Sequence, residues 1–272
     1  MSFELKTIKV ELKNYVAVVY LNRPKLNAMN MQFFKDLLSC FTRLKEDSSV
    51  RSILLVSAFK HFTAGLDLKE AVSFPGTTDL DPARAAFQFM TDLGLMQDSI
   101  TAIEACKKPV IVGVNGLCIG GGIDLITACD IRLCSADAKF TVKEVDVGLA
   151  ADLGTLQRLP KVVGNHSWIN DICFTGRFFD AKEALNFGLV SRVYEDPKQL
   201  FEEGFKLAVE IGDKPPIATR SIKEVLLHSR DHSVDDGLKY VSVWNSVMLN
   251  SPDTITAATA ALSKSKGTYS KL

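Results

Sequence analysis

The sequence predicts an α/β fold with parallel strands, followed by an all-helical C-terminal region. Up to about residue 195, short apolar runs typical of buried strands alternate with longer segments whose apolar residues recur at helical spacing. Beyond that point the strand-like runs stop, and segments with helical periodicity follow one another. We therefore expect an α/β core over 1–195 and a C-terminal helical region over 196–272.

Within the core, each element follows from its apolar spacing and its flanking turn residues. Two strands joined at Lys13-Asn14 open the chain, and the helix after them carries its apolar residues on one face. In chain order we expect strands over 7–12 and 15–21, a helix over 31–45, a strand over 52–57, a helix over 83–106, a strand over 110–114, a helix over 124–129 and a strand over 131–133. The stretch 73–82 is rich in Ser, Thr, Pro, Gly and Asp, which indicates a surface loop.

The long helix 83–106 and the C-terminal helices are amphipathic. The long helix is expected to turn six apolar side chains inward: Phe89, Met90, Leu93, Met96, Ile100 and Ile103. The C-terminal helices are expected over 200–211, 217–229, 234–249 and 252–262. Because such helices cannot bury their apolar stripes alone, they should pack on the core or on neighbouring subunits.

Composition argues against several classes of protein. Lys+Arg and Asp+Glu number 32 each, so the formal net charge of zero does not favour a nucleic-acid or membrane-surface binder. No apolar run is long enough to span a bilayer. The six cysteines form no C-x-x-C pair, and we expect reduced, buried thiols. No metal site is expected, because His228 and His232 lack a nearby third ligand and fit a solvated or capping role.

The segment most informative about function is Gly120-Gly121-Gly122, which runs up to Asp124 at the expected start of a helix. Glycines let backbone N–H groups approach a ligand, and the first N–H groups of a helix are unpaired and partly positive. Such a turn can stabilise negative charge on a substrate oxygen, although a simple tight turn is the alternative. No Gly-Lys-Ser/Thr follows, and the glycine spacing is wrong for a dinucleotide fingerprint. With the carboxylates Glu144 and Asp152 further along, the pattern indicates proton transfer next to a carbonyl.

Three segments in this order resemble the crotonase (enoyl-CoA hydratase/isomerase) superfamily. They are Asn22-Arg23-Pro24 with Asn27-Ala28, Phe62-Thr63-Ala64-Gly65-Leu66-Asp67, and Asn115-Gly116 through Asp124 with Cys129-Asp130-Ile131-Arg132. Within the superfamily, residues 142–160 and 229–233 are most similar to the dienoyl-CoA isomerases. The resemblance covers essentially the whole chain. It implies a spiral of ββα units, a C-terminal helical oligomerisation region, trimers or dimers of trimers, and an acyl-CoA substrate with no separate cofactor.

The resemblance also implies roles for particular residues. The backbone N–H groups of Leu66 and Gly121 would bind the thioester oxygen, and Asp124, Glu144 and Asp152 match the acidic positions of the dienoyl-CoA isomerases. The residues expected to bind substrate or CoA are Lys25, Leu26, Thr63, Ala64, Gly65, Leu66, Asp67 and Gly121. Arg23 and Lys25 could meet phosphates, or could belong to a solvated turn.

The implied reaction moves two double bonds of a 3,5-dienoyl-CoA to give the 2,4-dienoyl-CoA during β-oxidation of unsaturated fatty acids. We assign Glu144 as the base at C2 and Asp152 as the acid at C6, because the apolar neighbours of Asp152 should raise its pKa and keep it protonated. Asp124 would orient the substrate or tune Glu144 through its charge. The alternative for Asp152 is a helix N-cap.

Other functions remain open on the sequence alone. A 2-enoyl-CoA hydratase would hold water between two glutamates, and the first of these positions is Asp124 here. A Δ3-Δ2-enoyl-CoA isomerase would not need Asp152, and a non-catalytic acyl-CoA-binding protein would need none of the acids. Finally, Ser270-Lys271-Leu272 has the sequence of a peroxisomal address, which predicts an import receptor as partner and the peroxisome as location.

Overall fold

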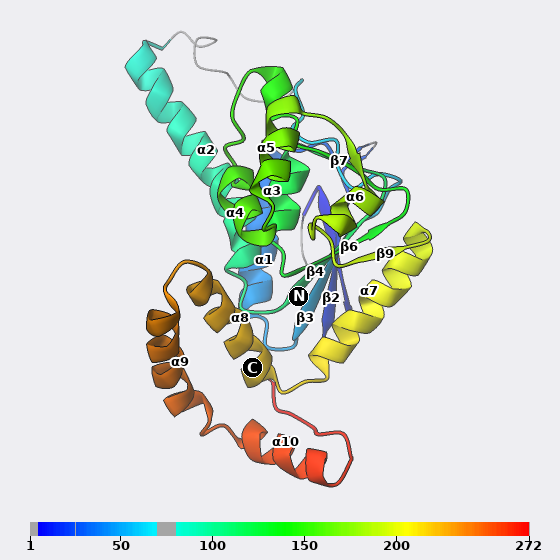
Figure 1. The fold of residues 1–272 in the computed structure, drawn as a ribbon, viewed down its shortest axis with the longest axis vertical. Coiled ribbons are helices and arrows are strands. Elements are labelled where there is room, and N and C mark those ends of the chain that lie inside the picture. The colour runs from blue at the N-terminus through cyan, green and yellow to red at the C-terminus, as the bar shows by residue number, and fades with distance from the viewer. Residues whose placement is uncertain (1–4, 25, 70–79, 272) are drawn as a thin grey trace.

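The strands form two sheets with helices packed on them (Figure 1). The computed structural model describes residues 5–24, 26–69 and 80–271. The larger sheet has six strands in the order β1-β2-β3-β4-β6-β9, in which β1 pairs antiparallel with β2 and the other neighbours are parallel. Its strands are β1 (Ile8–Lys13), β2 (Val16–Leu21), β3 (Ser52–Ser57), β4 (Val110–Val114), β6 (Ile131–Ser135) and β9 (Arg192–Tyr194). The second sheet joins β5 (Leu117–Ile119), β7 (Lys139–Thr141) and β8 (Phe179–Asp180).

Helices cover both faces of the larger sheet, which is why its central strands are continuous apolar runs. On one face, side chains such as Val19 and Leu55 belong to the large core that includes the buried sides of α1 (Met31–Glu46) and α2 (Pro82–Glu104). On the other face, Val18 and Leu54 pack with α7 (Pro197–Gly212). The α/β architecture expected from the sequence is therefore confirmed.

Two details of the prediction are wrong. Met90 was expected to face inward but is 65% exposed, because the N-terminal half of α2 extends beyond the sheet and only its later residues reach the core (Figure 1). The helix expected from residue 124 begins three residues earlier, as α3 (Gly121–Thr127), so the glycines themselves form its first turn. Of the loop expected over 73–82, residues 73–79 lie outside the described residues, and Pro82 already belongs to α2.

The short elements between residues 117 and 194 carry too few residues to show a period in the sequence. Besides the short strands, they are η1 (Glu144–Val147), α4 (Thr155–Val162), α5 (His166–Thr175) and α6 (Ala181–Asn186). They matter because η1 and the residues just before α4 carry two of the three acids.

The last three helices, α8 (Pro216–Arg230), α9 (Val234–Met248) and α10 (Pro252–Leu262), leave the core (Figure 1). Lys223 attaches α8 to the core through an ion pair with Asp130 at 2.8 Å. His232 Nδ1 lies 2.7 Å from the carbonyl oxygen of His228, in agreement with a capping role at the end of α8. None of the helices in the described chain is both long and apolar enough to cross a membrane.

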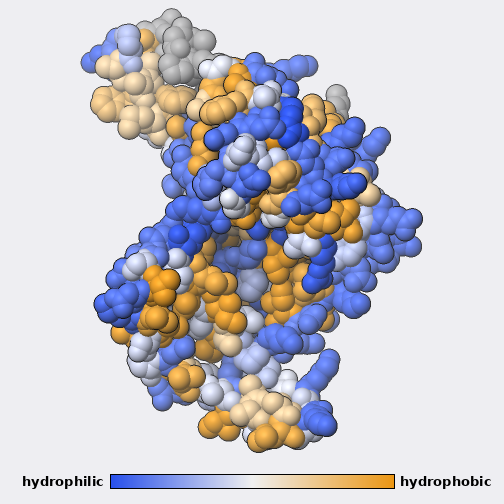
Figure 2. Space-filling view, viewed as in Figure 1, coloured by the Kyte–Doolittle hydropathy of each residue, from blue (hydrophilic) through white to orange (hydrophobic). Residues whose placement is uncertain are grey.

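Large apolar side chains on these helices remain exposed. Figure 2 shows hydrophobic residues gathered on this part of the surface. They include Ile222, Leu226, Leu238, Val243, Val247, Ile255 and Leu262. Apolar stripes of this kind are expected where a helix packs on another subunit.

Candidate active site

Two backbone turns bring a pair of N–H groups to one small cavity. Leu66 lies in the loop after β3, and Gly121 is the first residue of α3. Both line a cavity of about 80 Å³ together with Glu144. No oxygen of the described residues accepts a hydrogen bond from either N–H, so both are available to a ligand. Such a pair can stabilise an oxygen that becomes negative during a reaction.

The backbone geometry explains why glycines are needed at this turn. Gly120 has a φ of +52°, a conformation that L side chains rarely adopt, and a Cβ there would lie 3.2 Å from Glu144 Oε1. At Gly122 a Cβ would lie 2.6 Å from the Thr63 side chain. The glycines therefore let the chain turn sharply into α3 while Glu144 and the Thr63 loop approach closely.

Hydrogen bonds to buried polar side chains hold the Leu66 loop. The fully buried Asn27 donates from Nδ2 to the Phe62 carbonyl at 3.0 Å, and Thr63 Oγ1 donates to the Asn27 carbonyl at 2.7 Å. Thr63 is itself fully buried and accepts a bond from the Gly65 N–H, so it supports the loop from behind.

Of the residues expected along the CoA path, those that the structure describes lie around this loop. Arg23 pairs with Asp67 at 2.6 Å, which gives Arg23 a partner within the protein rather than leaving it solvated. The exposed Leu26 accepts a hydrogen bond through its carbonyl from the Ala64 N–H. Lys25 lies outside the described residues.

The three acids come from different elements. Asp124 projects from α3, Glu144 begins η1, and Asp152 precedes α4. Asp124 is fully buried, and its Oδ1 accepts a 2.5 Å hydrogen bond from the Thr155 N–H. Within the described chain, Asp124 Oδ2 and Glu144 Oε2 are buried without a hydrogen-bond partner. The N-cap of α4 is Gly154, and the first N–H of this helix donates to Asp124 rather than to Asp152, so the N-cap alternative for Asp152 is wrong.

Burial raises the pKa of all three acids, and repulsion from a neighbouring carboxylate adds to it for Glu144 and Asp124. Loss of solvent, followed by the charge of Asp124, raises the pKa of Glu144 to about 7. Burial raises the pKa of Asp124 to about 6, against the stabilising bond from Thr155 and with repulsion from Asp152. Burial also raises the pKa of Asp152, as the sequence predicted. The pKa of Glu144 therefore lies near neutral pH, where a base can exchange protons readily.

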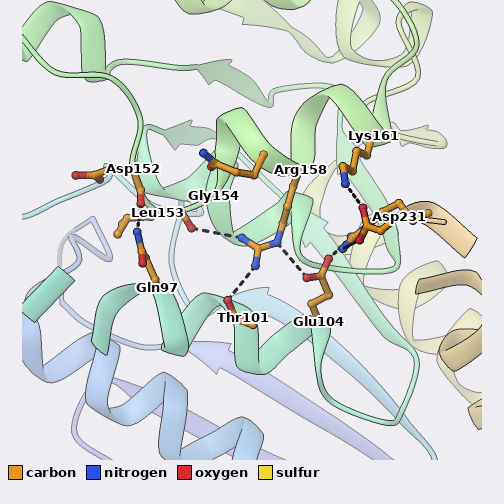
Figure 3. Close-up of a pocket in the computed structure, with 11 residues that line it drawn as sticks. Gln97, Thr101, Glu104, Asp152, Leu153, Gly154, Arg158, Lys161 and Asp231 are labelled. Carbon is orange, nitrogen blue, oxygen red and sulfur yellow. Dashed lines mark hydrogen bonds and ion pairs between the residues drawn. The ribbon is translucent and has the colours of Figure 1, made fainter. Parts of the chain in front are cut away.

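Glu144 and Asp152 line different cavities. An apolar cavity of about 400 Å³ extends from Glu144 along Val145, Leu149 and Ala151. Asp152 lines a more polar cavity of about 470 Å³ between α2 and α4 (Figure 3). Its side chain points away from Gln97 and Arg158 in that view. The link between the two acids is electrostatic, since the charge of Asp152 contributes to the raised pKa of Glu144.

Sequence reasoning missed the groups that fix the Asp152 segment, namely Gln97, Arg158 and the Thr155 N–H. The resemblance of residues 142–160 was the one signal that included Arg158 and Thr155. Among the described residues, no three His, Cys, Asp or Glu side chains lie together so that they could hold a metal ion. All six cysteines are free thiols in the structure.

Comparison with known proteins gives matches over nearly the whole chain. The sequence pattern of the family described as "Enoyl-CoA hydratase/isomerase" matches residues 11–254. The chain is 48% identical to a rat protein named Delta(3,5)-Delta(2,4)-dienoyl-CoA isomerase, mitochondrial, over 96% of this chain and 81% of that one. It is 43% identical to an Arabidopsis thaliana protein of the same name, peroxisomal, over 98% of both. The crystal structure of an enoyl-CoA hydratase from Bacillus anthracis superposes with a TM-score of 0.87 at 26% identity, covering 97% of this chain and 99% of that one.

Proposed function

The chain belongs to the enoyl-CoA hydratase/isomerase family, and from this premise we propose that it is a Δ3,5-Δ2,4-dienoyl-CoA isomerase of unsaturated fatty acid β-oxidation. The observation that carries the proposal is the small cavity in which the two free amides of Leu66 and Gly121 meet the carboxyl group of Glu144. The names of relatives that match nearly the whole chain support the choice of a diene substrate.

The proposed reaction begins at the α-carbon of the thioester. Glu144 removes a proton from C2, and the electron pair moves toward the thioester oxygen, where the Leu66 and Gly121 amides donate hydrogen bonds. Losing one such donor costs about 3–4 kcal/mol in comparable sites. The enolate is conjugated through C3 and C5 to C6, and Asp152 delivers a proton to C6. The double bonds then lie at C2 and C4, and solvent returns Glu144 and Asp152 to their starting protonation states.

The remaining site residues are proposed to hold the substrate. Residues Lys25, Leu26, Ala64, Gly65 and Asp67 would line the path of CoA, with Thr63 supporting their loop. Asp124 would act by tuning Glu144, because it is fully buried and its charge is the second cause of the raised pKa of Glu144.

A direct assay tests the function. Purified protein incubated with a 3,5-dienoyl-CoA should generate the near-ultraviolet absorbance of a conjugated 2,4-dienoyl-CoA. A 2-enoyl-CoA offered in parallel should lose little absorbance, since Asp124 already accepts the Thr155 N–H and is too short to match a second glutamate. Rapid hydration of the 2-enoyl-CoA without isomerisation of the diene would favour the hydratase instead.

The pH dependence should report the pKa of the base. Because Glu144 acts when deprotonated and its pKa is raised to about 7, kcat/KM should rise as pH increases through about 7. Asp124→Asn removes a negative charge that raises this pKa, so the rising limb should move to lower pH. A limb that stays in place in this variant would show that Asp124 does not tune Glu144.

Assembly and location are proposed on further grounds. The exposed apolar side chains of α8, α9 and α10 support a homo-oligomer, a trimer or a dimer of trimers, formed through the helical region 196–272.

The peroxisome is the proposed location, supported by the plant relative named peroxisomal and by the address-like Ser270-Lys271-Leu272, whose last residue lies outside the described residues. Light scattering of the purified protein and imaging of an N-terminally tagged chain, with and without this tripeptide, would test the two proposals.

A further inference from the structure

Two side chains donate hydrogen bonds to the backbone carbonyls of the segment 152–154. Gln97, on α2, donates from Nε2 to the Asp152 carbonyl at 2.7 Å. Arg158, on α4, donates from Nη1 to the Leu153 carbonyl at 3.4 Å. The φ of Gly154 is +125°, and a Cβ there would collide with Arg158 Nη1, so the guanidinium lies directly on this backbone. In Figure 3 the Asp152 carboxyl group points away from both of these side chains.

The other end of the same segment is tied to the active site. The N–H of Thr155 donates to Asp124 Oδ1, so a shift of residues 152–155 would disturb both carboxylates. The position of Asp152 relative to Glu144 therefore depends on two anchors, one at Asp124 and one at Gln97 and Arg158.

Arg158 is in turn fixed by a network that reaches the C-terminal helices. Its side chain is 11% exposed, and it donates to Glu104 Oε2 at 3.3 Å and to Thr101 Oγ1 at 3.0 Å. Glu104 also pairs with Arg230, at the end of α8, and Lys161 of α4 pairs with Asp231. The pKa of Glu104 is lowered overall, because the guanidinium groups of Arg230 and Arg158 together outweigh the effect of burial, which raises it. This carboxylate therefore stays charged.

We propose that Gln97 and Arg158 are positioning residues that aim Asp152 at the distal carbon of the substrate, and that Arg230 supports them by holding Glu104 against Arg158. Residues 229–233 take no direct part in the proposed reaction, but through Arg230 and Asp231 they would support the residues that position Asp152. Each link is a contact between side chains or backbone of α2, α4 and α8. The inference rests on the proposed function, because it presupposes that Asp152 delivers the proton to C6.

The two halves of the reaction provide a test that separates positioning from folding. In D₂O, exchange of the C2 hydrogen of a 3,5-dienoyl-CoA needs Glu144 and the two amides, whereas formation of the 2,4-diene also needs Asp152. Arg158→Met should lower kcat for isomerisation about 10- to 100-fold, because small misplacements of a reacting group have effects of this size. C2 exchange and KM should stay within about twofold of the parent protein. Arg158→Lys, which keeps a charge for Glu104, should recover part of the loss.

A second pair of variants covers the case in which Arg158→Met does not fold. Gln97 and Gln88 are both exposed glutamines on α2, but Gln88 donates to Asp92 and does not touch the segment. Gln97→Ala should therefore lower isomerisation without lowering C2 exchange, whereas Gln88→Ala should leave both unchanged. Parallel loss of exchange and isomerisation in the Arg158 and Gln97 variants, or no loss in either, would overturn the inference.

Asp152→Asn serves as the reference in the same assay and should lose isomerisation while retaining exchange. If it isomerises the diene normally, the role of Asp152 in the proposed function is wrong, and the positioning inference falls with it. If it behaves as expected while the Arg158 and Gln97 variants do not, only the positioning inference is overturned.

Discussion

Replacing the base, Glu144→Gln, should lower both C2 hydrogen exchange and diene isomerisation by about 10²- to 10⁴-fold, the range usual for a general base. The amide has nearly the shape of the carboxyl group but cannot accept the C2 proton. Both measurements should fall together, because every later step requires the enolate. Exchange measured by mass spectrometry in D₂O and isomerisation followed by absorbance would show this directly.

The same variant should fold at least as stably as the parent protein. The pKa of Glu144 is raised from 4.5 to about 7, so the folded chain binds this proton more tightly than the unfolded chain does. The contribution of Glu144 to stability therefore falls as pH rises from about 4.5 to about 7, and it stays unfavourable above that range. Because glutamine does not ionise, the melting temperature of Glu144→Gln at pH 8 should equal or exceed that of the parent protein. A marked decrease would mean that lost activity reflects unfolding rather than loss of a base.

The buried carboxyl groups also show how the site is built at a cost to the fold. A buried oxygen without a partner is unfavourable, and within the described chain both Asp124 and Glu144 have one. Burial raises the pKa of both carboxyl groups, and a neighbouring charge adds to it, that of Asp124 for Glu144 and that of Asp152 for Asp124. In the part of the chain that the structure describes, the Leu66 and Gly121 amides lack an acceptor and Glu144 lacks a proton donor, and a thioester with an acidic C2 proton would supply both, which favours a catalytic explanation over a structural one.

Much of the fold could be predicted because its strands and long helices have strong periods. The apolar runs of β3 and β4 and the one-sided helix α1 were identified to within a residue or two. The helix α2 was also found, but its inward face was only partly right, because periodicity cannot show where a helix leaves the sheet. The turn that precedes α3 could be predicted from its glycines. The start of α3 at Gly121 could not, because it depends on the positive φ of Gly120.

The site was less predictable, since it depends on contacts between distant segments. The roles of the three acids came from the family resemblance, and no local pattern shows that Glu144 and Asp152 line separate cavities. The contact of Gln97 with the Asp152 carbonyl joins residues 55 apart in the chain. Such pairs carry no periodic or compositional signal, so the groups that support Asp152 could be found only in three dimensions.

Replacing the acid, Asp152→Asn, should separate the two proton transfers. The asparagine cannot donate the carboxylic proton, so isomerisation should fall by about 10²- to 10⁴-fold. The Leu66 and Gly121 amides and Glu144 remain in place, so C2 exchange should persist. This outcome differs from that of Glu144→Gln, in which both fall, and it would identify Asp152 as acting only after the enolate has formed.

The protonation of Asp152 is the physical condition on which this prediction depends. In the free protein its pKa is raised by burial, but the side chain remains accessible from a polar cavity. An acyl chain that reaches C6 would displace water from Asp152, and further loss of water raises the pKa of a carboxyl group again. We therefore expect kcat, which reports the substrate complex, to stay high to a more alkaline pH with a dienoyl-CoA long enough to cover Asp152 than with a shorter one. Identical alkaline limbs for the two chain lengths would contradict this account of how Asp152 keeps its proton.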